Sequence, residues 1–125
     1  QVAAIQEAWN EFGRLLSQGT PTGKTDFAFH RAVAAATNNP FYLEVLDALG
    51  SRTIPCDVAS PWGTESVLTY EYQVGLHEEH RRILNAIAAR DADGAREAMR
   101  DHLSRSQVRY RNRLAEQSQT KQDQP

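Results

Sequence analysis

Two polar side chains in the first third of the chain have types and a spacing that suit cation binding. Asp26 and His30 are four residues apart. On an α-helix, side chains at this spacing lie on one face, one turn from each other. A carboxylate oxygen and an imidazole nitrogen placed in this way can share a metal ion. The same spacing also suits a simple Asp–His hydrogen bond on a helix surface.

Two further histidines occur within helical patterns of apolar residues. His80 is followed at intervals of three, four and seven residues by Ile83, Leu84 and Ile87. His102 shares a helical stripe with Ala95, Ala98, Met99 and Ser106. A single histidine on an apolar face is more often a core residue with satisfied hydrogen bonds than a metal ligand.

The histidines taken together favour a metal site. Burying a neutral imidazole costs free energy unless its two nitrogens find partners. One metal ion would satisfy a nitrogen of each ring and would neutralise the carboxylate. We therefore expect four ligands to converge on one ion: Asp26, His30, His80 and His102. His77, one turn before His80, ranks second to it as a ligand and is expected at the pocket edge or in solvent.

The donor set limits the metal and leaves two other functions open. Three nitrogens and one carboxylate oxygen suit Zn²⁺ or Ni²⁺, and also Fe²⁺ or Mn²⁺, better than Ca²⁺ or Mg²⁺. One alternative is a metalloenzyme in which an Asp/His₃ site activates water. The other is a structural dimerisation domain without metal. Because Glu78, Glu79 and Asp101 are expected to point outward, no convincing general base is found, and a binding module is favoured over an enzyme.

The elements that must position these residues are predicted to be helices. Apolar residues recur at three- and four-residue intervals nearly throughout, and no strand pattern of useful length occurs. Gly19 is placed to end the first helix, Asn39 to cap the third and Asp91 to cap the last. The expected helices cover about 2–16, 25–37, 40–49 and 64–89, the fourth with a possible break at Gly75, and a fifth follows Asp91. An all-α antiparallel bundle results, because each helix has an apolar stripe to bury.

Composition supports a single domain and restricts its partners. The 125 residues carry a net charge of −2, which does not suggest a nucleic-acid-binding surface. We predict a helical domain over residues 1–116, a loop over 51–63 and a frayed polar tail over 117–125. Four aromatic residues are expected in the core: Trp9, Phe12, Phe41 and Tyr42. The late arginines are expected on a solvated helix face: Arg105, Arg109, Arg111 and Arg113.

Three features of the sequence predict its compartment. No apolar run approaches the length needed to span a bilayer, and no signal peptide is visible at the start. Cys56 is the only cysteine and cannot form an internal disulfide, which suits a reducing cytoplasm. We therefore expect a cytoplasmic protein in which Cys56 is an inert thiol.

Four segments resemble a known family when they are taken in order. They are Asp26–Val33, Asn38–Phe41, His80–Ile87 and Asp91–Leu103. They are similar to the D-x-x-x-H, H-x-x-I-L-x-A-I and D-x-x-x-A-x-x-x-M-x-x-H-L patterns of the FCD domain. That domain is the C-terminal effector domain of FadR-subfamily GntR bacterial transcription regulators. Each piece alone is weak, whereas the ordered set over residues 26–103 is specific.

The resemblance implies a ligand-sensing function. It implies an antiparallel helical bundle in which Asp26, His30, His80 and His102 bind a divalent metal. It also implies a small organic acid, often a carboxylate, bound at or beside that metal, and a homodimer whose geometry controls its grip on operator DNA. Arg52 is a candidate partner for an acidic effector.

Two parts of the family pattern are missing from this sequence. The winged helix-turn-helix that should precede the domain is absent, so we expect DNA contact only through an N-terminal domain that this chain lacks. The first helix of the effector domain, which in relatives often supplies an arginine near the ligand, is also absent. We therefore expect part of the ligand pocket to be missing.

Overall fold

The computed structural model describes residues 1–50 and 69–122 of the chain, and these residues form five helices and no strand. The helices are α1 (Val2–Ser17), α2 (Gly23–Ala36), α3 (Pro40–Leu49), α4 (Tyr70–Ala88) and α5 (Ala92–Gln122). The predicted all-α fold is therefore confirmed. The loop predicted over 51–63, together with Cys56 and Arg52, lies outside the described residues.

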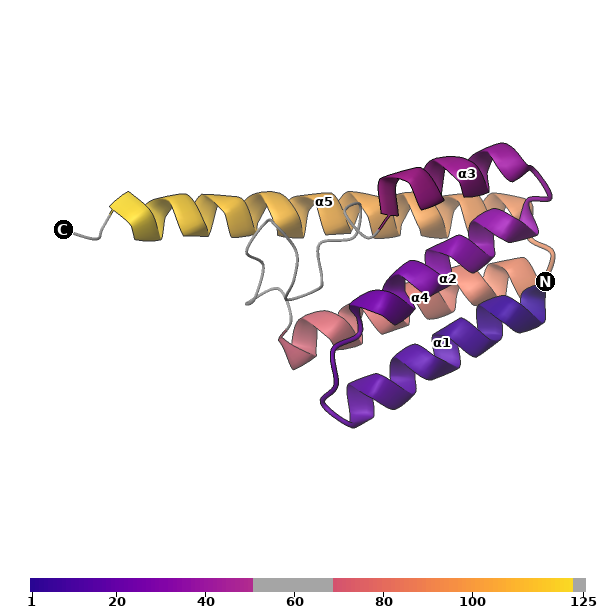
Figure 1. Ribbon diagram of the computed structural model, residues 1–125, viewed down its shortest axis with the longest axis horizontal. Helices are drawn as coiled ribbons and strands as arrows, with labels where there is room; N and C mark the ends of the chain where they lie inside the picture. The colour runs from indigo at the N-terminus through magenta and orange to yellow at the C-terminus, as the bar shows by residue number, and fades with distance from the viewer. Residues whose placement is uncertain (51–68, 123–125) are drawn as a thin grey trace.

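The helices pack as an antiparallel bundle in which successive helices run in alternating directions (Figure 1). α1 packs against both α2 and α4, α4 also packs against α5, and α3 packs against α2. The C-terminal part of α5 projects beyond the other helices (Figure 1). None of the helices in the described part of the chain combines the length and the apolar character needed to cross a membrane.

The predicted ends of the first three helices agree closely with the structure. Gly19 has φ +69° and follows the end of α1, where a residue with a side chain would be strained. The side chain of Asn39 accepts a hydrogen bond from the Phe41 amide at the start of α3. α2 begins at Gly23, two residues before the predicted start, which places Asp26 in its first turn.

The last two helices are more continuous than predicted. α4 runs through Gly75 without a break. At the start of α5 the carboxylate of Asp91 accepts a hydrogen bond from the Gly94 amide at 2.9 Å, as expected of a cap. α5 then continues to Gln122, into the segment predicted as a frayed tail. Residues 95–122 contain neither glycine nor proline, so no residue type forces this helix to end.

Apolar residues from the packed helices form the core. One cluster joins α1, α2, α4 and α5 through Ile5, Phe29, Ile83, Leu84 and Ala98. A second cluster joins α1 to α4 through Phe12, Leu16 and Leu76. Since side chains from α2, α4 and α5 meet in the first cluster, this core fixes the three helices that carry the predicted metal ligands.

The prediction that Phe41 and Tyr42 lie in the core is wrong. Their side chains are 63% and 54% exposed, and none of the residues of α3 is buried. Among the described helices α3 packs against α2, and its half-buried leucines are Leu43 and Leu46. Phe12, in contrast, is fully buried and Trp9 half-buried, as expected.

We expect that shortening a side chain of the core destabilises the protein, whereas shortening a side chain of α3 has little effect. Ile5→Ala should lower the free energy of unfolding by about 2–5 kcal/mol, because Ile5 is fully buried and its loss leaves a cavity. Val45→Ala on α3 shortens a side chain that is 41% exposed, and it should change the free energy of unfolding by less than about 1 kcal/mol. Urea denaturation of both variants measures the difference, and equal losses would contradict the assignment of the core.

Candidate metal centre

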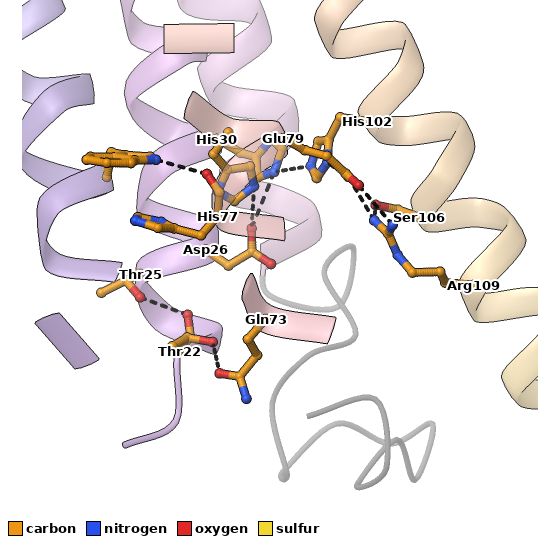
Figure 2. Close-up of polar contacts among 12 residues, drawn as sticks. Thr22, Thr25, Asp26, His30, Gln73, His77, Glu79, His102, Ser106 and Arg109 are labelled. Atoms are coloured by element: carbon orange, nitrogen blue, oxygen red, sulfur yellow. Dashed lines mark hydrogen bonds and ion pairs between the residues drawn. The ribbon is translucent and has the colours of Figure 1, made fainter. Parts of the chain in front are cut away.

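The structure brings the four predicted ligands together from three helices. Asp26 and His30 lie on α2, His80 on α4 and His102 on α5. One nitrogen from each of the three imidazoles lies within 4.8 Å of the corresponding atoms of the other two. The carboxylate of Asp26 lies below the rings in Figure 2 and points toward them.

The distances within the group are short. Asp26 Oδ1 is 3.4 Å from His30 Nε2 and 3.3 Å from His80 Nε2. His102 Nε2 is 3.3 Å from His30 Nε2. Two atoms that each lie about 2.1 Å from a shared metal ion are roughly 3–4 Å apart, depending on the coordination geometry. These separations are therefore compatible with a shared ion after small side-chain adjustments.

Burial at the centre is nearly complete. His80 is fully buried, and Asp26 and His102 are each 3% exposed. The His80 ring stacks on Phe29, with 4.2 Å between ring centroids, and meets Phe12 edge-on. Neither ring nitrogen of His80 makes a well-aligned hydrogen bond with a described residue, although Nε2 lies 3.3 Å from Asp26 Oδ1. A buried polar atom without a partner is costly, and a metal ion at Nε2 would relieve part of that cost.

The surroundings of Asp26 and His80 favour the deprotonated form of each side chain, which is the form that binds a metal. Burial opposes ionisation of Asp26, but interactions with His30 and His80 outweigh it and hold the pKa of this carboxyl well below its usual value. For His80, burial dominates over the attraction of Asp26 and lowers the pKa to about 4. At neutral pH the site therefore presents an anionic carboxylate and a neutral imidazole.

The start of α2 is fixed by buried hydroxyl groups, which positions Asp26. The Thr22 hydroxyl donates to Gln73 Oε1 of α4 at 2.7 Å, and the Thr25 hydroxyl donates to the Thr22 carbonyl at 2.8 Å (Figure 2). The Asp26 amide also donates to the Thr22 carbonyl. Asp26 thus lies in the first turn, where the helix dipole favours a negative charge.

The prediction that Glu79 points outward is wrong. Glu79 is 8% exposed, and its Oε1 accepts a hydrogen bond from His102 Nδ1 at 2.7 Å. Arg109 of α5 donates to both carboxylate oxygens of Glu79 at 2.9 Å (Figure 2). Burial alone would raise the pKa of Glu79, yet the hydrogen bonds from His102 and Arg109 lower it to about 2.

Arg109 therefore does not lie on a solvated helix face as predicted. The positions of Glu79 and Arg109 in the helical repeat were a sequence signal for their place on the inner faces of α4 and α5. Glu79 falls on the buried stripe of α4, three residues after Leu76 and four before Ile83. Arg109 lies seven residues after His102, which places it on the same side of α5. The apolar pattern alone gave no reason to bury a charge at either position.

His77 belongs to a different environment from the other histidines. Its ring stacks on Trp9 of α1 at 4.1 Å and on Phe12 at 5.2 Å. A Cβ added at Gly13 would lie 3.0 Å from His77 Nε2, so the absence of a side chain there lets the ring approach α1. His77 is half-buried and was expected at the pocket edge or in solvent; it instead joins α4 to α1.

The fold and this side-chain group define a helical bundle with a cluster of three histidines that could hold a metal ion. Comparison with known families agrees with that class, since residues 1–105 match the FCD domain family. The chain belongs to the FCD domain family, as its ordered sequence patterns predicted.

Two curated relatives are transcription regulators. The chain is 32% identical over 102 residues to the HTH-type transcriptional regulator LutR of Bacillus subtilis (strain 168), an alignment covering 80% of this chain and 45% of that protein. It is 30% identical over 111 residues to the HTH-type transcriptional repressor NanR of Klebsiella aerogenes, covering 89% of this chain and 41% of that protein. The chain thus spans less than half the length of either relative.

The pKa shifts predict that the metal-free domain becomes less stable as the pH falls. The His80 pKa is about 4 in the folded state and about 6.5 in an unfolded chain, so the unfolded state binds more protons between these values. Stability should be fully present above pH 6.5 and should fall, by on the order of 3 kcal/mol, as the pH drops to 4. Asp26 and Glu79 add losses of the same sign below about pH 4.5, because their folded pKa values are also lowered.

Urea denaturation in the presence of a chelator, repeated from pH 7.5 to 4.5, measures this dependence. His80→Gln should show a shallower decline between pH 6.5 and 5, whatever its stability at pH 7.5. An unfolding free energy of the parent chain that stays constant over this range would contradict the assigned burial of His80.

Proposed function

We propose that this domain is the ligand-sensing part of a GntR-family transcription regulator. In this proposal Asp26, His30, His80 and His102 bind one divalent transition metal, and a small organic acid binds at that metal. The observation that carries the proposal is the close approach of three imidazoles from three helices, two of which, those of His30 and His80, also contact the buried carboxylate of Asp26. A bundle that needed only a packed core would gain nothing from four polar side chains at its centre.

The donor set favours Zn²⁺ or Ni²⁺, with Fe²⁺ and Mn²⁺ as further candidates. Imidazole nitrogens suit all of these ions, and a single carboxylate is too little oxygen for Ca²⁺. Three neutral imidazoles and one carboxylate leave a divalent ion with a net charge of about +1. An anion is therefore favoured in any remaining coordination position, which supports a carboxylate as the effector.

The surroundings favour binding over catalysis. Among the described residues, Glu79 is the acid next to the cluster that could serve as a general base. Its two oxygens already accept hydrogen bonds from Arg109, and Oε1 also accepts one from His102. A carboxylate held in this way by an arginine is a weak base. The relatives, which are transcription regulators, support the same conclusion.

In the regulator as a whole, metal and acid would act on DNA binding from a distance. The relatives carry helix-turn-helix names and are more than twice as long as the aligned region. We infer that DNA contact belongs to a separate N-terminal domain and that the sensor domain changes its geometry. The homodimer stays a prediction of the resemblance, and the cytoplasmic location stays a prediction from the sequence.

The metal proposal predicts one equivalent of metal per chain. Elemental analysis of the purified 125-residue protein should find it in the parent, and the variants Asp26→Ala, His30→Ala and His102→Ala should each lose most of it, because each removes a ligand. His77→Ala is the matched control: it removes a histidine of α4 that stacks on Trp9 outside the cluster, and it should retain the metal.

Circular dichroism separates loss of metal from loss of fold in these variants. His30 gives the clearest case, because its side chain is 13% exposed and its truncation disturbs the core least. A folded His30→Ala or His102→Ala protein with full metal content would refute the proposed ligand set.

The effector proposal predicts a metal-dependent rise in melting temperature with the right acid. A ligand that binds only the folded state adds RT ln(1 + [L]/Kd), about 2.7 kcal/mol at a hundredfold excess over Kd. A panel of mono-, di- and tricarboxylates should contain at least one acid that raises the melting temperature by several degrees. The same screen after complete metal removal should show little or no rise. An acid that gives an equal rise in both screens would show that it is not held by the metal.

A further inference from the structure

The ring of His102 has a carboxylate partner at its Nδ1 atom, whereas the Nδ1 atom of His80 makes no hydrogen bond with a described residue. A neutral imidazole carries one proton, on either Nδ1 or Nε2, and only the nitrogen without the proton can bind a metal. His102 Nε2 faces the cluster, 3.3 Å from His30 Nε2. His102 Nδ1 faces away from it, 2.7 Å from Glu79 Oε1.

We propose that Glu79 is a positioning residue that holds His102 in the Nδ1–H tautomer, with Arg109 holding Glu79 in place. An ionised carboxylate can only accept hydrogen bonds, so the short contact with Glu79 Oε1 requires the proton of a neutral ring to sit on Nδ1. The lone pair of Nε2 is then directed at the cluster. The inference rests on the proposed metal site, for which it supplies a ligand that is oriented before any metal arrives.

Arg109 makes the buried Glu79 carboxylate possible. Its guanidinium donates to both oxygens of Glu79 at 2.9 Å, the paired geometry that fixes a carboxylate in one orientation. The guanidinium also donates to the Ser106 hydroxyl at 3.1 Å and lies 5.0 Å from the centre of the Tyr72 ring. Glu79 therefore has one position available, and that position fixes the plane of the His102 ring.

His80 shows what this arrangement adds. Its Nδ1 is buried and makes no hydrogen bond with a described residue, and its contact with a carboxylate, Asp26 Oδ1 at 3.3 Å, is at Nε2, on the cluster side of the ring. A hydrogen bond that the outer N–H of a metal-binding histidine donates to a carboxylate orients the ring and raises its basicity. The ring of His102 is accordingly oriented from outside the cluster, by Glu79.

The tautomer can be measured directly in the metal-free protein. Long-range ¹H–¹⁵N correlation spectra at pH 8, with a chelator present, should show His102 of the parent with a protonated Nδ1 and an unprotonated Nε2. Glu79→Gln should give a mixture of the two tautomers, because an amide can donate or accept at this position. Competition with a chromophoric chelator should show a 10- to 100-fold loss of Zn²⁺ affinity in this variant.

Two further variants separate positioning from a purely structural clamp between α4 and α5. Glu78→Gln changes the neighbouring glutamate, which is exposed and paired with Arg81, and it should leave both the tautomer and the Zn²⁺ affinity unchanged. Arg109→Met removes the clamp but keeps the carboxylate, so it should lower the melting temperature while His102 keeps its proton on Nδ1.

The outcomes distinguish this inference from the metal proposal itself. A His102 ring protonated on Nε2 in the parent, or a Glu79→Gln protein with unchanged tautomer and Zn²⁺ affinity, would overturn the inference. Absence of Zn²⁺ binding by the parent would overturn the metal proposal, while the spectra of the metal-free protein would still report on Glu79.

Discussion

The burial of one negative charge, that of Asp26, is the constraint on which the rest of the site depends. An ionised carboxylate removed from water is very costly unless polar partners surround it. Here the partners are His30, one turn further along α2, and His80 of α4. The ring of His102 from α5 lies beside His30. The three helices must therefore hold one relative register, and the apolar cluster of Ile5, Phe29 and Ile83 beside the site stabilises that register.

A second buried negative charge, that of Glu79, lies at the outer edge of the cluster and also depends on polar partners. Glu79 is compensated by Arg109, and both belong to the interface between α4 and α5. The two carboxylates have different neighbours: Asp26 lies against the imidazoles of His30 and His80, whereas Glu79 contacts both the imidazole of His102 and the guanidinium of Arg109.

The sequence predicted the parts of this arrangement that follow from local rules. Helical periodicity located all five helices, and the caps at Asn39 and Asp91 occupy the predicted positions. The convergence of Asp26, His30, His80 and His102 was predicted because polar residues on apolar faces demanded a common partner. Glu79 and Phe41 were misplaced for opposite reasons: burial of a charge depends on a partner 30 residues away, and exposure of an aromatic ring depends on which helices cover it.

The length of α5 has a mechanical consequence. The helix begins near the bundle's edge, carries His102 and continues without glycine or proline to Gln122. At 1.5 Å per residue, the twenty residues after His102 form a rod of about 30 Å. Because Arg109 ties α5 to Glu79 of α4, a rotation of about 5° at Arg109 would move the far end, thirteen residues on, by roughly 2 Å. α5 thus connects the histidine cluster, near its N-terminal end, to a C-terminal segment that extends past the rest of the bundle (Figure 1).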